Sequence, residues 1–356
     1  MTKSEQQLWQ SFSAPIIGLS PMDGVTDHPY RHIQKKYGNP DLIYTEFTNV
    51  EGLCHGAEKL LTDFLYDESQ RKIIAQIYGT TPLYFRQAAT LLCELGFDGI
   101  DINMGCPAKT VASSGAGAAL IKNPDLACQI VIAVKAGVED YANGKRTKDC
   151  SDISPKIVRE IEKRHALLPA EHQAEKSIPV SIKTRIGYDK PVIEEWIPTL
   201  LELEPAAIAL HGRTLKQQYS GFASWDQIGI AAQVVKNSKI KLLGNGDIAS
   251  LEDAKNKIDM YQLDGVLIGR ASFGNPFIFC TTKPSDSPTL FQIAVEHSQL
   301  FEQTYGNWER YSFMPMRKHL GWYCRGFDAA KEVRAKLFTA NSAADVEMVL
   351  KEYNLL

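Results

Sequence analysis

The sequence has no stretch of the kind that carries a chain into or across a membrane. Residues 1–12, MTKSEQQLWQSF, are polar and contain no apolar core such as a secretory signal needs. No apolar run approaches the roughly 20 residues that span a bilayer as a helix. We therefore expect a cytoplasmic protein that does not associate with membranes.

The chain also lacks paired cysteines and a large excess of charge. No two of its seven cysteines form a C-x-x-C pair, which argues against structural zinc, and we expect no metal. An odd count without a signal fits reduced thiols. The net charge is −3, so any nucleic-acid-binding surface must be local. The cysteines are Cys54, Cys93, Cys106, Cys128, Cys150, Cys280 and Cys324.

Apolar residues are abundant enough to build one large domain and a small one, since 44% of the 356 residues are hydrophobic. Eight short apolar runs recur, and helical patterns such as 83–96 and 124–138 lie between most of them. This alternation predicts a (β/α)8 TIM barrel over residues 1–283. A doubly wound open sheet is the alternative, but no glycine fingerprint follows the first run. The runs are 16–22, 41–47, 72–79, 99–105, 178–187, 206–214, 241–248 and 265–272.

The connection between the fourth and fifth runs is longer than one helix requires. Its surplus, about residues 140–177, is polar and nearly neutral, and its pattern predicts one helix from Ser154 to Leu168. In a barrel this connection lies on the face away from the active site. We interpret it as an insertion that decorates the barrel.

A second, all-helical domain of residues 289–356 follows the Pro- and Ser-rich stretch 283–289. Within it, 311–338 carries six basic residues against Asp328 and Glu332. Basic side chains interleaved with aromatic ones are typical of nucleic-acid binding, although a solvated helical face would have a similar composition. The basic residues are Arg317, Lys318, Arg325, Lys331, Arg334 and Lys336, and the aromatic ones are Trp322, Tyr323 and Phe327.

Polar residues gather at the expected carboxyl ends of the strands, which is the active-site end of a barrel. A purely structural barrel would need few of them. Their convergence therefore predicts an active site at that rim. They are Met22, Asp23, Glu46, Gln76, Asn103, Cys106, Lys183, Arg185, His211, Arg213, Asn245, Asp247, Gly269 and Arg270.

The last two strands end in GNGDI and IGRASFGNP, which place glycines and Arg270 after strands seven and eight. Barrels commonly bind phosphate there through backbone N–H groups, and glycine permits a close approach. The same dipeptides also occur in ordinary turns.

Three rim residues each allow several chemistries. Lys183 could form a Schiff base or hold the anionic edge of a cofactor, and adjacent phosphate-binding turns favour the cofactor. His211 could be a base, a cofactor contact or a buried core histidine. Cys106, between Gly105 and Pro107, could be a nucleophile with a lowered pKa, a general acid that stays protonated, or a small buried hydrophobe.

Taken together, these residues resemble the tRNA-dihydrouridine synthases. The matching pieces come in order and cover both domains. The longest are DGIDINMGCPAKTV (98–111) and ALHGRTLKQQYSGFASWDQI (209–228). The others are SPMDGVTDHPYR (20–31), AQIYG (75–79), IPVSIKTRIGYD (178–189), LLGNGDI (242–248), GVLIGRASFGNP (265–276) and MRKHLGWY (316–323).

The resemblance implies an FMN-dependent enzyme that uses NADPH to reduce the C5=C6 bond of a tRNA uridine. Hydride would reach C6 from reduced flavin, and Cys106 would donate the proton to C5. FMN would be held by Pro21, Met22, Asp23, Gln76, Lys183 and His211, and its phosphate by Asn245, Gly246, Asp247, Gly269 and Arg270.

For the substrate, the resemblance implies that Asn103 touches an extruded uracil with Arg185 beside it, and that Lys109 lies near the RNA. Arg317 and Lys318 would grip tRNA phosphates. We expect a monomer. The strand-four loop and the RKHLGWY segment point toward different bacterial subgroups, so the particular uridine is left open, and the 140–177 insertion is not part of the usual family core.

Two other functions fit parts of the sequence. A flavin-dependent reductase of free pyrimidines would not need a basic, aromatic C-terminal domain. A flavin-binding RNA chaperone without turnover would not need Cys106 and Asn103 on one loop.

Overall fold

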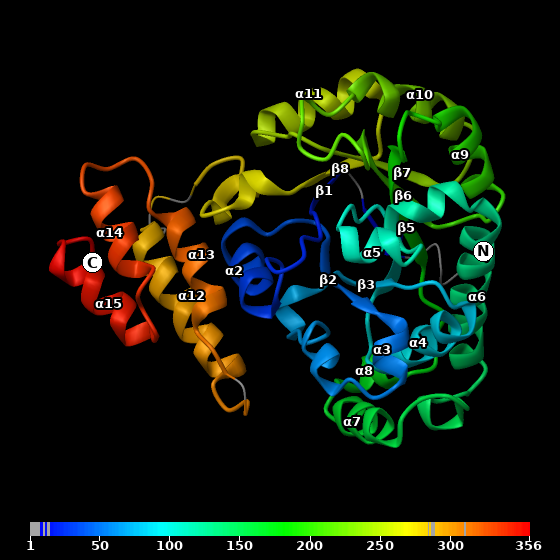
Figure 1. The fold of residues 1–356 in the computed structure, drawn as a ribbon, viewed down its shortest axis with the longest axis horizontal. Coiled ribbons are helices and arrows are strands. Elements are labelled where there is room, and N and C mark those ends of the chain that lie inside the picture. Colours follow the sequence, from blue (N-terminus) through cyan, green and yellow to red (C-terminus); the bar gives the residue numbers. More distant parts are fainter. Residues whose placement is uncertain (1–7, 10, 13–14, 284, 286–288, 310) are drawn as a thin grey trace.

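The computed structural model describes residues 8–9, 11–12, 15–283, 285, 289–309 and 311–356 (Figure 1). Eight strands form one sheet, and each lies within or beside one of the eight predicted runs. The predicted strands are therefore confirmed. Their bounds are β1 Ile16–Leu19, β2 Ile43–Asn49, β3 Ile73–Tyr78, β4 Gly99–Met104, β5 Val180–Gly187, β6 Ala207–Thr214, β7 Lys241–Asn245 and β8 Gly265–Ile268.

All strand pairs are parallel, in the order β1-β8-β7-β6-β5-β4-β3-β2. At the two ends of this order, Leu19 N donates to Leu42 O (2.9 Å) and Asp41 N donates to Ile17 O (3.0 Å). The sheet is therefore curled into a TIM-barrel-like form. A doubly wound sheet is wrong for this chain, because sequential strands remain neighbours and the strand order never reverses.

Helices between the strands cover the outside of the curled sheet (Figure 1). Helices α2, α4 and α6 begin with a proline in the first turn, and in α2 the capping side chain of Asp27 accepts from Tyr30 N at 2.9 Å. The α-helices are α2 His28–Gly38, α3 Val50–Cys54, α4 Pro82–Glu94, α5 Lys109–Ser113, α6 Pro124–Ala142, α7 Pro155–His165, α8 Ala170–Gln173, α9 Ile193–Leu201, α10 Trp225–Val235 and α11 Leu251–Tyr261. The 3₁₀ turns are η1 Glu58–Thr62, η2 Glu68–Gln70, η3 Gly117–Lys122, η4 Thr147–Asp149, η5 Arg270–Ser272 and η6 Pro276–Phe279.

Within the described residues, no single helix is long and apolar enough to cross a membrane. One bent pair, Lys109–Lys122 with Pro124–Ala142, passes by length and composition only.

Alternation along the strands separates an apolar floor from a polar rim. Side chains of one parity pack outward against the helices, as Ile100 and Ile102 do. Side chains of the other parity face the interior. Near the amino ends of the strands these are apolar and form a small cluster of their own with Leu42, Ile74 and Leu243. The polar residues further along each strand therefore emerge together at the carboxyl ends.

The predicted insertion is built from η4, α7 and α8 (Figure 1). The predicted helix is confirmed at Pro155–His165. It buries Ile157 and Ile161, and Arg164 Nη1 donates to Leu61 O at 2.8 Å. A Cβ on Gly96, in the turn from α4 to β4, would lie 2.8 Å from Leu168, so this segment packs on the helix-to-strand side.

The C-terminal region is all-helical, as predicted, and forms the left-hand lobe of Figure 1. Its helices share a core with Ile33 of α2, and the ring of Trp322 stacks on Phe273 at 3.9 Å and 10°. The helical lobe is therefore joined to the barrel by apolar and aromatic packing. Most of the predicted linker 283–289 lies outside the described residues. The helices are α12 Leu290–Tyr305, α13 Met314–Tyr323, α14 Ala330–Leu337 and α15 Ala343–Glu352.

Candidate active site

Strand register brings the polar rim residues of β3, β4 and β5 into one hydrogen-bonded chain. Gln76 lies beside Asp101, and Asp101 beside Ser181. Gln76 Nε2 donates to Asp101 Oδ2 (2.7 Å), Ser181 Oγ donates to Asp101 Oδ1 (2.6 Å), and Asn103 Nδ2 donates to Gln76 Oε1 (3.0 Å). Each of these polar groups is buried and partnered, so the chain fixes the interior of the site.

Lys183 extends this arrangement toward β7. Its Nζ donates to Asn245 Oδ1 (3.1 Å), and Asn245 Nδ2 donates to Leu267 O (2.8 Å). Burial, and secondly the charge of Arg185, lowers the pKa of Lys183 to about 8. Burial raises the pKa of Asp101 to about 6. Each of the two groups favours the charged form of the other, so Lys183 and Asp101 form an interacting pair of ionisable groups in the polar part of the site.

Cys106 is held directly after β4. Asn103 Oδ1 accepts from both Gly105 N (3.0 Å) and Cys106 N (2.8 Å), and Arg185 Nε donates to Gly105 O (2.5 Å). Cys106 is 8% exposed, and burial is the main cause that raises the pKa of its thiol. A thiol that stays protonated at neutral pH suits an acid better than a nucleophile.

The turn after β7 has the geometry of an anion cradle. Gly246 has φ 129° and Asp247 has φ 52°, and a Cβ on Gly246 would lie 2.7 Å from the Ala223 side chain and 3.0 Å from His211. Within the described chain, the backbone N–H groups of Gly246 and Asp247 donate to no protein acceptor. Two free donors in a left-handed turn are suited to a phosphate.

The side-chain carboxylate of Asp247 is not available to a ligand, because it accepts hydrogen bonds from the protein. It accepts from Arg213 Nη2 (2.6 Å), Arg270 Nη2 (2.5 Å) and Ala223 N (2.7 Å). The side chain therefore fastens three groups around the turn, and only the backbone N–H of Asp247 remains for a phosphate. Gly269, after β8, lies beside Met22, whose sulfur is 3.4 Å from where a Cβ would be.

His211 lies among cations. Burial, and then the charges of Arg185, Lys183, Arg213 and Arg270, lowers its pKa well below the ordinary value. His211 is therefore neutral at pH 7. The same set of causes shows that four cationic side chains surround this histidine at the strand ends, and such a cluster attracts an anionic ligand.

The loop after β1 carries Pro21, Met22 and Asp23. Pro21 and Met22 are half-buried, whereas Asp23 is exposed. Met22 N donates to Thr26 Oγ1 at 3.0 Å, and Lys318 Nζ of α13 donates to Gly24 O. This loop thus connects the strand ends to the helical lobe.

Two of the predicted substrate contacts lie apart from the strand-end cluster. Arg317 braces α13 against the chain before α15, because Nε donates to Ala340 O (2.9 Å) and Nη2 to Asn341 Oδ1 (2.7 Å). Lys109 is exposed at the start of α5, three residues after Cys106.

The aromatic side chains of the C-terminal segment are used in packing. Trp322 stacks on Phe273, Tyr323 is 3% exposed, and Phe327 meets Phe291 edge-on at 5.3 Å. Composition alone does not distinguish a packed ring from an exposed one, so the pattern of basic and aromatic residues does not by itself indicate rings that stack on bases.

Sequence analysis places Arg213 at the rim without a specific role and assigns no role to Asp101, yet both are central to the geometry. Arg213 shares a strand face with His211, and it is 2% exposed. It donates to Gln218 O (3.2 Å), Ser220 O (3.0 Å) and Gly221 O (2.8 Å) as well as to Asp247. The sequence did contain a sign that these residues belong to the site. Asp101 is two residues from Asn103, and Arg213 is two residues from His211, so each pair lies on one face of its strand.

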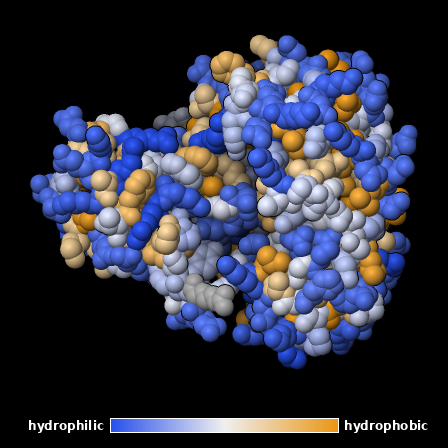
Figure 2. All heavy atoms as spheres, viewed as in Figure 1, coloured by the Kyte–Doolittle hydropathy of each residue, from blue (hydrophilic) through white to orange (hydrophobic). Residues whose placement is uncertain are grey.

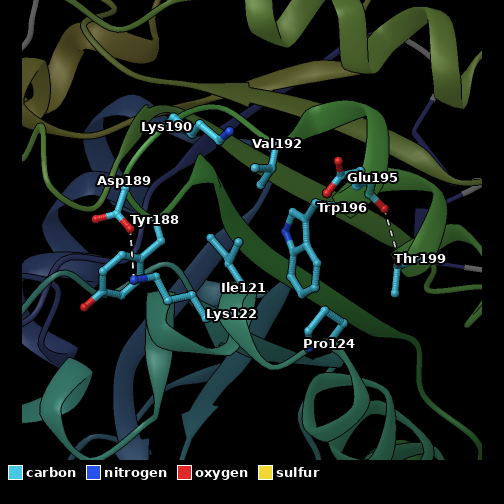
Figure 3. Close-up of a pocket in the computed structure, with 10 residues that line it drawn as sticks. All are labelled: Ile121, Lys122, Pro124, Tyr188, Asp189, Lys190, Val192, Glu195, Trp196 and Thr199. Atoms are coloured by element: carbon cyan, nitrogen blue, oxygen red, sulfur yellow. Dashed lines mark hydrogen bonds and ion pairs between the residues drawn. The ribbon is translucent and has the colours of Figure 1, made fainter.

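A separate cavity of about 310 Å³ is lined by the end of η3, the start of α6, the loop after β5 and α9 (Figure 3). Ile121, Pro124 and Trp196 point toward one another in it, and Lys122 meets Asp189 at its edge at 2.9 Å. None of the predicted site residues lines this cavity. It is therefore separate from the strand-end site.

A barrel-like sheet with a buried polar network, a cationic rim and a protonated thiol at its strand ends defines a protein of the barrel-enzyme class. The sequence model of the dihydrouridine synthase (Dus) family matches residues 18–147 and 156–355. The chain belongs to this family. Most of the segment interpreted as an insertion falls inside the match, which passes over only residues 148–155.

Curated relatives agree with this membership. A probable tRNA-dihydrouridine synthase of Staphylococcus aureus (strain COL) is 30% identical over 98% of this chain and 96% of its own length. Probable tRNA-dihydrouridine synthase 2 of Bacillus subtilis (strain 168) is 30% identical over 98% and 97%. Among solved structures, an old yellow enzyme homologue from Zymomonas mobilis overlaps with a TM-score of 0.41 at 13% identity, covering 77% of this chain and 91% of that one. That overlap is too low to carry an argument.

Proposed function

We propose that the protein is a tRNA-dihydrouridine synthase that binds FMN, takes its electrons from NADPH and reduces the C5=C6 bond of a tRNA uridine. The observation that carries the proposal is the convergence, at the strand ends, of the free N–H groups of Gly246 and Asp247, the cations near His211 and the thiol of Cys106 held by Asn103. Family membership supports the reaction class.

The residues present fit FMN. The free N–H groups of Gly246 and Asp247 suit its phosphate, and Arg270, from the neighbouring turn after β8, is bonded to the Asp247 side chain beside them. Gly269 would allow close approach, and Asn245 holds Lys183 in place. The ammonium of Lys183 and the amide of Gln76 would hold the polar edge of the ring, with Pro21, Met22, Asp23 and His211 around it.

When bound and reduced, FMN supplies the hydride that adds to C6 of the uracil. The chain's own part is to position the base and to deliver the proton. Cys106 would give its thiol proton to C5, and Asn103 and Arg185 would hold the Cys106 loop at the height of the base. Asn103 keeps a second Nδ2 hydrogen with which it could touch the uracil.

The helical lobe, proposed as a domain of residues 289–356, would hold the tRNA body. Figure 2 shows a hollow between this lobe and the barrel. Lys318 lies at the barrel side of the lobe. Within the described part of 311–338, Arg325 and Lys331 are the exposed cations without a protein partner. They join Lys318 as candidates for phosphate contacts, and they are stronger candidates than Arg317, whose guanidinium is hydrogen-bonded within the lobe.

The test uses the purified chain and its visible spectrum. NADPH should bleach a bound flavin, and tRNA lacking dihydrouridine should restore the colour and yield dihydrouridine at one position by mass spectrometry. A colourless protein that cannot be reconstituted with FMN would contradict the proposal. A reduced flavin that free uracil reoxidises, but tRNA does not, would instead favour the small-molecule reductase.

A further inference from the structure

The loop after β6, residues 215–223, presents two aromatic side chains to solvent. Phe222 is 87% exposed and Tyr219 is 72% exposed. Phe222 has the highest exposed fraction among the large hydrophobic side chains of the described residues, and two exposed rings three residues apart are a local cluster of the kind that marks an interaction site. We call this segment the aromatic rim loop.

The backbone of the aromatic rim loop is tightly held. Arg213 donates to three of its carbonyls, and Gln217 Nε2 donates to Ser220 O (3.0 Å) and Phe222 O (2.8 Å). At its end, Ala223 N donates to Asp247. Because the loop is already ordered, placing a ligand on its rings would require little further loss of backbone entropy.

The loop adjoins the proposed cofactor site. Asp247, in the phosphate turn, binds both Arg213 and Arg270. The guanidinium of Arg270 lies over the ring of Tyr219, 5.3 Å from its centroid, and Tyr219 is near enough to Arg185 to affect its pKa. Tyr219 therefore stands at the mouth of the same site, and Phe222 follows three residues further along the same loop.

The surroundings of the loop are positive. Lys122 and Lys216 share the single carboxylate of Asp189, at 2.9 and 2.6 Å, just as Arg213 and Arg270 share that of Asp247. Four cations thus face two anions. Exposed rings among excess cations are the combination that holds unpaired nucleotides, through stacking and phosphate contacts.

We propose that Tyr219 and Phe222 stack on unpaired bases of the tRNA that flank the target uridine. This inference rests on the proposed function and assigns a second RNA contact, on the barrel itself, in addition to the helical lobe. A uridine extruded from a folded tRNA leaves its neighbours partly unstacked, and the aromatic rim loop would receive them.

The test measures binding and turnover separately, with full-length protein and an in vitro tRNA transcript. Phe222→Ala and Tyr219→Ala should each raise the Kd for the transcript about tenfold, equivalent to about 1.4 kcal/mol. Turnover at saturating tRNA and the KM for NADPH should not change. Phe222→Trp and Tyr219→Phe, which retain a ring, should bind as the wild type does.

Two comparisons make the result specific. Leu167→Ala removes a side chain that is 77% exposed on the opposite, helix-to-strand side, and it should leave the Kd unchanged. The salt dependence of binding should keep its slope in Phe222→Ala, since no phosphate contact is lost, whereas Lys216→Ala should reduce it.

Unchanged transcript binding in both alanine variants would overturn the inference, and so would an effect confined to the KM for NADPH. If the wild type binds tRNA but forms no dihydrouridine, the proposed function fails while the binding comparison still decides the role of the two rings. A wild type that does not bind the transcript at all would overturn both.

Discussion

Two regions of this protein combine basic and aromatic residues, and the structure treats them in opposite ways. In 311–338 the rings of Trp322 and Tyr323 are packed between helices and barrel. In the aromatic rim loop the rings of Tyr219 and Phe222 are exposed while the backbone beneath them is fixed. Judged by composition, segment 311–338 resembles an RNA-binding surface more closely than the aromatic rim loop does. Judged by the exposure of the rings, the aromatic rim loop resembles such a surface more closely.

The comparison shows that the groups which a basic or aromatic side chain contacts in the fold decide whether it stabilises the fold or is available for binding. Arg317 and Arg334 donate to backbone carbonyls inside the helical lobe and so stabilise its fold. Arg213 also donates to carbonyls, but the loop that it holds faces the strand ends. The same hydrogen-bonding chemistry stabilises a core in one case and presents a binding surface in the other.

The largest expected effect involves neither region and sets the scale for both. Cys106→Ala should slow reoxidation of the reduced flavin by tRNA about 10²- to 10⁴-fold, the usual contribution of a general acid. Reduction of the flavin by NADPH should be unaffected. Single-turnover absorbance measurements separate the two steps, and Cys128→Ala, at a half-exposed cysteine of α6, is the matched control.

The pH dependence of that step follows from the buried thiol. Burial raises the pKa of Cys106 above its ordinary value of 9.0. An acid is active while protonated, so the rate should stay level through pH 7 to 8 and fall only above about 9. A rate that instead rises with pH in this range would show a thiolate at work and would remove the proton donor from the mechanism.

The second-largest expected effect is a difference in unfolding free energy between substitutions in the two aromatic regions. Trp322→Ala removes a half-buried ring stacked on Phe273 and should cost about 2–4 kcal/mol of unfolding free energy. Phe222→Ala should change it by no more than about 0.5 kcal/mol. Denaturant titration of both variants measures the contrast, and equal losses would mean that the rim loop is also a packing element.

The smallest effect tests the basic side of the helical lobe. Arg325→Ala and Lys331→Ala should each weaken tRNA binding about threefold to tenfold and lower the slope of log Kd against log salt by about 0.7–0.9 per lost phosphate contact. Arg317→Met, whose guanidinium is engaged within the lobe, should reduce stability without changing the slope. If Arg317→Met changes the slope and the other two variants do not, the helical lobe meets tRNA through a different face.

The sequence predicted the strands closely because apolar runs and turn residues are local signals. The runs continued beyond the ends of β1, β7 and β8, where Met22, Asp247 and Arg270 belong to turns and not to strands. Those turns carry candidate site residues. A local pattern of apolar and small residues does not distinguish the last residue of a strand from the first residue of a binding turn.

Within the candidate site, the predicted residues that meet are those on interior-facing strand positions, such as Gln76, Asn103 and Lys183. Their convergence follows from strand alternation and parallel order. The role of Arg213 could not be predicted in this way, because its partners lie in the following loop and in the turn after β7. Loop conformation depends on such contacts rather than on periodicity.

By itself, the sequence determined the order of strands and helices, the residue types at the rim and the membership of a family, since each is written in local pattern and motif. Only the tertiary structure decided that Cys106 keeps its proton, that Lys183 loses part of its basicity, and that the ring of Trp322 packs on Phe273 while that of Phe222 is exposed. Burial and neighbouring charge arise from residues distant in the chain, so they exist only after the chain has folded.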